Sequence, residues 1–130
     1  MTLRIGLLGC GTVGGGVLKL LKANAASLEA RVGAKLEVAR VLVRDPAKDR
    51  VEELDKKMLT TNASDILDDS SIDIVVEVMG GADAAKSYVE RAIRTKKQVV
   101  TANKMLLAMH GPALVEKARE NNVDLAFEAS

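Results

Sequence analysis

The stretch Ile5-Gly6-Leu7-Leu8-Gly9-Cys10-Gly11-Thr12-Val13-Gly14 decides the fold of this chain. An apolar run leads directly into glycines with the spacing Gly-x-Gly-x-x-Gly, and the residues that follow have helical periodicity. In a strand that turns sharply into a helix, Gly9 permits the tight turn, Gly11 lets the backbone approach a pyrophosphate, and Gly14 lets the helix pack close to the strand. The unpaired N–H groups and the positive dipole end of the helix attract the phosphates. The spacing alone is a weak signal. In this setting it predicts a dinucleotide-binding turn in which the backbone at Thr12 and Val13 faces the pyrophosphate.

Strand-like and helix-like stretches alternate along the rest of the chain. We expect strands at residues 3–8, 36–43, 58–60, 72–79, 98–102 and 123–128. We expect helices at residues 13–28, near 49–57, at 64–68, at 85–93 and from Pro112 onward. Gly33 is the expected stop after the first helix, and Leu114, Val115 and Ala118 form the expected inner face of the last one. Strands that alternate with helices imply parallel pairing and right-handed crossovers. The expected fold class is therefore α/β: a Rossmann-type, doubly wound, mainly parallel sheet in the order 3-2-1-4-5-6, forming a single domain over residues 1–130.

The glycines that open the first predicted helix carry further information. Gly14, Gly15 and Gly16 follow one another in its first turns, and each costs about 1 kcal/mol relative to alanine inside a helix. Together they indicate that the helix backbone approaches a neighbouring segment closely.

Composition narrows the class of protein. A chain of 130 residues with 48% hydrophobic residues fits one domain with a core, which must be aliphatic because Tyr88 and Phe127 are its only aromatic residues. A net charge of +1 gives no reason to expect a nucleic acid or an anionic membrane as partner. No stretch reaches the ~18 apolar residues of a membrane span. The single cysteine, Cys10, excludes an internal disulfide and suits a reducing cytoplasm, where we expect the protein to reside.

The carboxyl ends of parallel strands meet at one edge of the sheet, and ligands bind at that edge. Gly80 and Gly81 follow the predicted strand at 72–79 and would give a cofactor room beside the backbone, although such a pair is also an ordinary turn. Thr101 ends the next strand and is predicted to line the nicotinamide ribose. Asn103 is expected to shape the turn and cap the next helix.

The residue after the second strand distinguishes the two nicotinamide dinucleotides. An acidic residue there favours NAD(H), because it accepts hydrogen bonds from the ribose 2′-hydroxyl, whereas an arginine accommodates the 2′-phosphate of NADP(H). Arg44 comes first and Asp45 second, so NADP(H) is favoured and NAD(H) stays possible. The alternative interpretation is that Arg44 is a solvated loop residue.

Several segments, taken in order, resemble the N-terminal NAD(P)-binding part of homoserine dehydrogenase. They are residues 6–17, 41–45 and 75–81, the segment Val99-Val100-Thr101-Ala102-Asn103-Lys104 with residues 106–108 and 110–111, and the ending Phe127-Glu128-Ala129-Ser130. This resemblance covers the whole chain. It implies the NAD(P)-dependent interconversion of aspartate-4-semialdehyde and homoserine, which leads to threonine, methionine and isoleucine.

The resemblance also assigns individual residues. It places Lys104 near the nicotinamide and the substrate, where a lysine with a lowered pKa can act as a general acid or base; the alternative is a solvated lysine that begins a helix. It gives Glu128 a part in a monovalent-cation site completed by backbone carbonyls that follow it. The resemblance implies a longer, homo-oligomeric parent enzyme whose substrate residues lie after Ser130. We therefore expect this chain to bind a dinucleotide without turning over homoserine or its semialdehyde.

Other polar residues allow two interpretations each. Glu77 lies inside an apolar strand, where we favour a structural carboxylate bonded to nearby backbone over a catalytic one. Thr12 is also a candidate helix cap. Cys10 is favoured as a small residue of the glycine turn over a redox site, and His110 beside Gly111 as a turn residue. Two other functions of the whole chain stay possible: the cofactor domain of another amino-acid or semialdehyde dehydrogenase, and a nucleotide-sensing module without catalysis.

Overall fold

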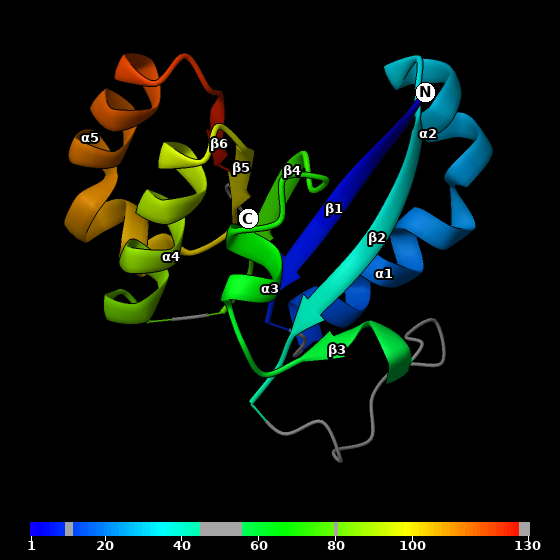
Figure 1. The fold of residues 1–130 in the computed structure, drawn as a ribbon, viewed down its shortest axis with the longest axis horizontal. Coiled ribbons are helices and arrows are strands. Elements are labelled where there is room, and N and C mark those ends of the chain that lie inside the picture. The colour runs from blue at the N-terminus through cyan, green and yellow to red at the C-terminus, as the bar shows by residue number, and fades with distance from the viewer. Residues whose placement is uncertain (10–11, 45–55, 80, 128–130) are drawn as a thin grey trace.

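One six-stranded sheet forms the centre of the molecule (Figure 1). The computed structural model describes residues 1–9, 12–44, 56–79 and 81–127. The strand order is β3-β2-β1-β4-β5-β6, and every pairing is parallel, which confirms the predicted α/β class and strand order. The strands are β1 (Thr2–Leu8), β2 (Lys35–Leu42), β3 (Leu59–Thr60), β4 (Ile74–Glu77), β5 (Gln98–Thr101) and β6 (Leu125–Phe127).

The helices follow the predicted alternation with two differences in their bounds. They are α1 (Thr12–Ala23), α2 (Ala25–Val32), α3 (Ser64–Leu67), α4 (Asp83–Arg94) and α5 (Lys104–Glu120), with a 3₁₀ turn η1 at Lys56–Met58. The helix expected at 13–28 is two helices, because the chain breaks at Asn24, whose side-chain amide donates to the Leu20 carbonyl at 3.0 Å. The predicted stop at Gly33 is confirmed, since this residue is left-handed, with φ 80°. The helix expected near 49–57 falls largely outside the described residues.

The start of α5 corrects a second expectation. The helix begins at Lys104, and Pro112 lies inside it. The Asn103 side chain caps the helix, accepting from the Leu106 N–H at 3.0 Å. The buried face consists of Leu106, Gly111, Leu114 and Ala118, whereas Val115, expected on this face, is 48% exposed. His110 is therefore a helical residue and not a turn histidine.

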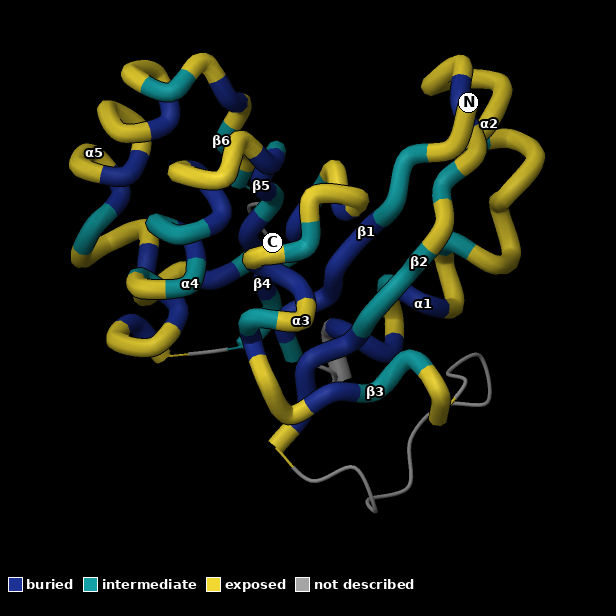
Figure 2. Tube along the Cα trace, in the orientation of Figure 1, coloured by how far each residue is buried: buried dark blue, intermediate teal, exposed yellow. Residues whose placement is uncertain are grey.

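Helices cover both faces of the sheet, as a doubly wound fold requires. Alternate residues of β1 point to opposite sides: Leu7 packs with Leu18 of α1, while Leu8 belongs to the larger core that includes α3, α4 and α5. Figure 2 shows the buried carboxyl-terminal half of β1, beside β4, in which intermediate and buried residues alternate. At Gly6 a Cβ atom would lie only 2.4 Å from Cγ2 of the fully buried Ile66, so this glycine lets α3 pack directly on β1.

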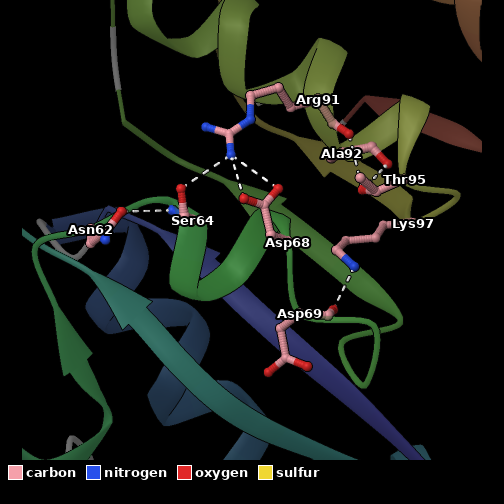
Figure 3. A network of polar contacts seen from close by, with 8 residues as sticks. All are labelled: Asn62, Ser64, Asp68, Asp69, Arg91, Ala92, Thr95 and Lys97. Carbon is pink, nitrogen blue, oxygen red and sulfur yellow. Dashed lines mark hydrogen bonds and ion pairs between the residues drawn. The ribbon is translucent and has the colours of Figure 1, made fainter.

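Polar contacts fix the segment between α3 and β4 at the amino end of the sheet (Figure 3). From α4, Nη2 of Arg91 lies 3.0 Å from both carboxylate oxygens of Asp68 and 3.3 Å from Oγ of Ser64. Lys97, which is buried, donates to the Asp69 carbonyl at 2.6 Å, and burial lowers the pKa of its ammonium group. This end of the sheet is thus closed by internal contacts and lies opposite the edge predicted to bind a ligand.

Candidate dinucleotide-binding edge

The turn after β1 requires glycine for two separate reasons. Gly9 has φ +98°, in the left-handed region that side chains rarely adopt, and a Cβ there would lie 3.2 Å from the Met79 Cα and the Val78 carbonyl oxygen. Its N–H donates to the Leu42 carbonyl at 3.0 Å. The turn is therefore fastened to β2 on one side and lies against the end of β4 on the other.

Gly14 brings α1 against this turn. It is buried, and a Cβ there would lie 2.7 Å from the Gly9 carbonyl oxygen and 3.4 Å from a methyl group of Val78. The predicted close packing of helix on strand is confirmed at this position. Gly16 is different: it is exposed, and a Cβ would meet nothing within 4 Å, so the expectation that all three glycines serve a close approach is wrong for this one.

Helix α1 begins at Thr12, so its N-terminus adjoins the turn as predicted. The backbone N–H groups of a first helical turn have no partner inside the helix. With the positive end of the helix dipole, they form a site suited to a phosphate. Cys10 and Gly11 lie outside the described residues, as do the side chains of Thr12 and Val13, so the predictions made for them stay predictions.

Arg44 follows β2 at the same edge. The N–H of Val43, its neighbour, donates to the Thr60 carbonyl at 2.9 Å, which holds the end of β2 beside β3. The Arg44 side chain is exposed and makes no hydrogen bond or ion pair with the part of the chain that the structure describes. A guanidinium in this position is available to a ligand. Asp45, the competing candidate, lies outside the described residues.

A fully buried carboxylate lies where β4 and β5 end. Oε1 of Glu77 accepts from the Thr101 hydroxyl at 2.6 Å, and Oε2 accepts from the Met79 N–H at 2.8 Å and from the Asn103 amide at 3.3 Å. The Asn103 amide also donates to the Gly81 carbonyl. The prediction that Glu77 bonds nearby backbone is confirmed by its bond to Met79.

The Thr101 side chain forms internal hydrogen bonds in place of the predicted contact with a nicotinamide ribose. Its hydroxyl donates to Glu77 and accepts from the Asn103 N–H at 3.1 Å, and the residue is fully buried. Its hydroxyl is therefore not directed to a ligand surface. A contact with a nicotinamide ribose stays a prediction only for the backbone of Thr101.

A hollow of about 380 Å³ opens beside this buried network. It is lined by Val78, Met79, Gly81, Ala102, Asn103, Lys104 and Met105. Lys104, the first residue of α5, is exposed and forms no ion pair with the described residues, so its ammonium group is free to meet a ligand. Gly80 lies outside the described residues.

Sequence reasoning assigned Asn103 to the helix cap but missed its bridge between Glu77 and Gly81. It placed Met79 at the ligand edge but missed Met105 as a lining residue. The sequence signal for Met79 is its position at the end of the predicted strand 72–79, directly before Gly80 and Gly81.

Metal binding finds no support in the described part of the chain, where no cluster of His, Cys, Asp or Glu side chains could hold an ion. Glu128, the predicted cation ligand, lies outside it. None of the described helices combines the length and apolar character that a membrane span needs.

A parallel sheet of this order, with a glycine-tight turn after β1 and a hollow at the ends of β4 and β5, defines a nucleotide-binding α/β domain. Residues 9–128 match the model of a protein family, the NAD-binding domain of homoserine dehydrogenase. The chain belongs to this family.

Individual relatives agree with the family match. The chain is 46% identical to a homoserine dehydrogenase of Bacillus subtilis (strain 168) over 98% of its own length and 30% of the relative's. A crystal structure of S. aureus homoserine dehydrogenase at pH 7.0 superposes with a TM-score of 0.91 at 43% identity, covering 99% of this chain and 33% of that one. A hyperthermophilic archaeal homoserine dehydrogenase, solved in complex with NADPH, has a TM-score of 0.76 over 98% of this chain and 44% of its own. At 22% identity this last similarity shows the fold alone. The chain spans about 30% of the length of the B. subtilis relative.

Proposed function

We propose that residues 1–130 form the NAD(P)-binding domain of a homoserine dehydrogenase, which interconverts aspartate-4-semialdehyde and homoserine. The observation that carries the proposal is the close contact between Gly9 and Gly14, since a Cβ at Gly14 would overlap the Gly9 carbonyl oxygen and one at Gly9 would press on the backbone of Val78 and Met79. Such a turn leaves the N-terminus of α1 open to a pyrophosphate. The family match over residues 9–128 supports the reaction.

Each part of the dinucleotide then contacts a different set of residues. The pyrophosphate binds at Gly9, Gly11, Thr12, Val13 and Gly14. The adenosine half lies toward Arg44 at the end of β2, and the nicotinamide half lies in the hollow lined by Gly81, Asn103 and Lys104. Contacts of the nicotinamide half with Gly80 and with the Thr101 backbone stay predictions. When bound, the nicotinamide supplies the hydride donor or acceptor of the reaction. Lys104 is placed to contact the cofactor and to carry a proton at its Nζ atom.

NADP(H) is the favoured cofactor, with NAD(H) as the alternative. An exposed arginine without a partner among the described residues supports the first, because a guanidinium forms charge-assisted hydrogen bonds with a 2′-phosphate. The cytoplasmic location, the homo-oligomeric parent, the cation site at Glu128 and the absence of turnover by this chain stay predictions.

Calorimetric titration of the chain with NADPH and with NADH tests the proposal. We expect NADPH to bind more tightly. Arg44→Ala should weaken NADPH binding about tenfold or more, the loss of one hydrogen bond to a charged group, while leaving NADH binding unchanged. Arg31→Ala is the matched control, because Arg31 is an exposed arginine on α2 away from this edge.

Three outcomes would count against the proposal. Equal affinities for NADPH and NADH would remove the 2′-phosphate assignment, and binding of neither would remove the dinucleotide. Oxidation of homoserine by this chain alone would refute the prediction that it binds without turnover.

A further inference from the structure

We propose that Glu77 is a positioning residue that holds the wall of the nicotinamide hollow in its binding shape. The inference rests on the proposed function, because it assumes that the nicotinamide half of a dinucleotide binds there. In a doubly wound sheet the second mononucleotide half binds at the strands beyond β1, which here are β4 and β5. The hollow beside Lys104 lies at their carboxyl ends.

The groups that Glu77 fastens are the groups that line the hollow. Its carboxylate accepts from the N–H of Met79 and from the amide of Asn103, and Asn103 in turn donates to the carbonyl of Gly81. Met79, Gly81 and Asn103 all line the hollow, and Lys104 is the next residue along the chain. One buried side chain thus ties the end of β4 to the start of α5 beside the hollow.

A carboxylate satisfies all three of these partners at once. The Met79 N–H, the Thr101 hydroxyl and the Asn103 amide all donate, and an ionised carboxylate only accepts. A glutamine keeps an oxygen for Met79 and Asn103 only by turning its amide toward Thr101, whose hydroxyl can accept from it but then loses its own acceptor. No lysine, arginine or histidine of the described residues forms an ion pair with Glu77, so its charge is balanced by the donors and by the nearby N-terminus of α5.

The affinities of two ligands distinguish a residue that shapes the hollow from one that only stabilises the fold. NADPH occupies both halves of the site, whereas 2′,5′-ADP occupies only the adenosine half. A change confined to the hollow weakens NADPH and spares 2′,5′-ADP. A loss of overall stability reduces the folded fraction and lowers the apparent affinity for both ligands by the same factor.

The experiment is calorimetric titration of the wild-type chain and of Glu77→Gln with NADPH and with 2′,5′-ADP, after circular dichroism has established folding. We expect Glu77→Gln to bind NADPH about tenfold more weakly, as for one lost hydrogen bond to a charged group, and to bind 2′,5′-ADP as the wild type does. The fluorescence of the bound dihydronicotinamide should change as well. Glu90→Gln, at a half-buried position of α4 that does not line the hollow, is the matched control and should leave both ligands unaffected.

Asn103→Ser is the second variant for the same titrations, to be used if Glu77→Gln fails to fold. Serine retains the cap on α5 but lacks the amide that bridges Glu77 and Gly81, so it should show the same selective loss of NADPH. Unchanged NADPH binding by a folded variant, or equal losses for both ligands, would overturn the positioning role. A wild-type chain that binds 2′,5′-ADP but not NADPH would overturn it too. A wild-type chain that binds neither would overturn the proposed function, and this inference with it.

Discussion

Replacing Gly14 by alanine should separate the effect of close packing from that of helix propensity. The added Cβ would lie 2.7 Å from the Gly9 carbonyl oxygen and 3.3 Å from its carbonyl carbon. Both are backbone atoms, so no side-chain rotation relieves the contact, and α1 or the turn must move. Overpacking of this kind costs about 1–3 kcal/mol, and alanine returns about 1 kcal/mol of helix propensity. We therefore expect the free energy of unfolding to fall by about 0–2 kcal/mol.

Gly16→Ala is the matched control, because Gly16 lies in the same helix, is exposed, and would place its Cβ in open space. It should gain up to about 1 kcal/mol of stability. The propensity gain is common to both variants, so the difference between them isolates the overpacking, about 1–3 kcal/mol.

Urea unfolding followed by circular dichroism measures both free energies, with equal m-values as evidence that the two unfolding transitions are comparable. NADPH binding should weaken in Gly14→Ala alone, since only there must α1 or the phosphate turn move. Equal stabilities of the two variants would refute the reasoning, as would unchanged NADPH binding by Gly14→Ala.

Two further substitutions test the packing and the charges. Gly6→Ala should lower the free energy of unfolding by about 1–3 kcal/mol, because its Cβ would meet Cγ2 of Ile66, and Ile66→Leu, which removes that methyl group from the Cβ atom, should recover part of the loss. Absence of any recovery in urea unfolding of the double variant would contradict this contact. Glu90→Gln should lower stability by about 0.2–1 kcal/mol at neutral pH, because a hydrogen bond from Lys117 and the charges of Lys117, Lys86 and Arg94 hold the Glu90 pKa below its ordinary 4.5. A lowered folded-state pKa stabilises the protein above pH 4.5, and this contribution is lost as the pH falls through the folded-state value, so the two chains should converge in acid. A difference that does not change with pH would rule out the ion pairs as its source.

The strand order could be predicted because apolar runs and helical stretches alternate cleanly along the chain. The start of α5 could not, because two signals competed for it. Pro112 suits a first helical turn, whereas Asn103 suits a cap. The cap prevails: Asn103 accepts from the Leu106 N–H, and burial of Leu114 and Ala118 holds the helix together past the proline. Tertiary packing here outweighs the cost of a proline inside a helix, about 3 kcal/mol.

The glycine turn could be predicted because the contacts that require glycine lie mostly between residues close together in the sequence, such as Gly9 and Gly14. The role of Thr101 was not, because it depends on the pairing of two strands. Glu77 and Thr101 are register partners on β4 and β5, so their side chains share one face of the sheet and meet below the edge. When the register is unknown, a threonine at the end of a strand is expected to face the ligand. Pairing the two polar positions of neighbouring strands could have revealed the contact.

The two halves of the site are built from different interactions, and salt should distinguish them. The phosphate half uses the exposed Arg44 guanidinium and a helix N-terminus, whose attraction for a phosphate is screened by mobile ions. Glu77 and its partner Thr101 are fully buried, so mobile ions do not contact the carboxylate. The loss of NADPH affinity caused by Arg44→Ala should therefore shrink as the salt concentration rises, whereas the loss caused by Glu77→Gln should keep the same factor. Titrations of both variants at two salt concentrations measure this, and a Glu77→Gln effect that fades with salt would show that the charge of Glu77 acts through solvent rather than through its hydrogen bonds.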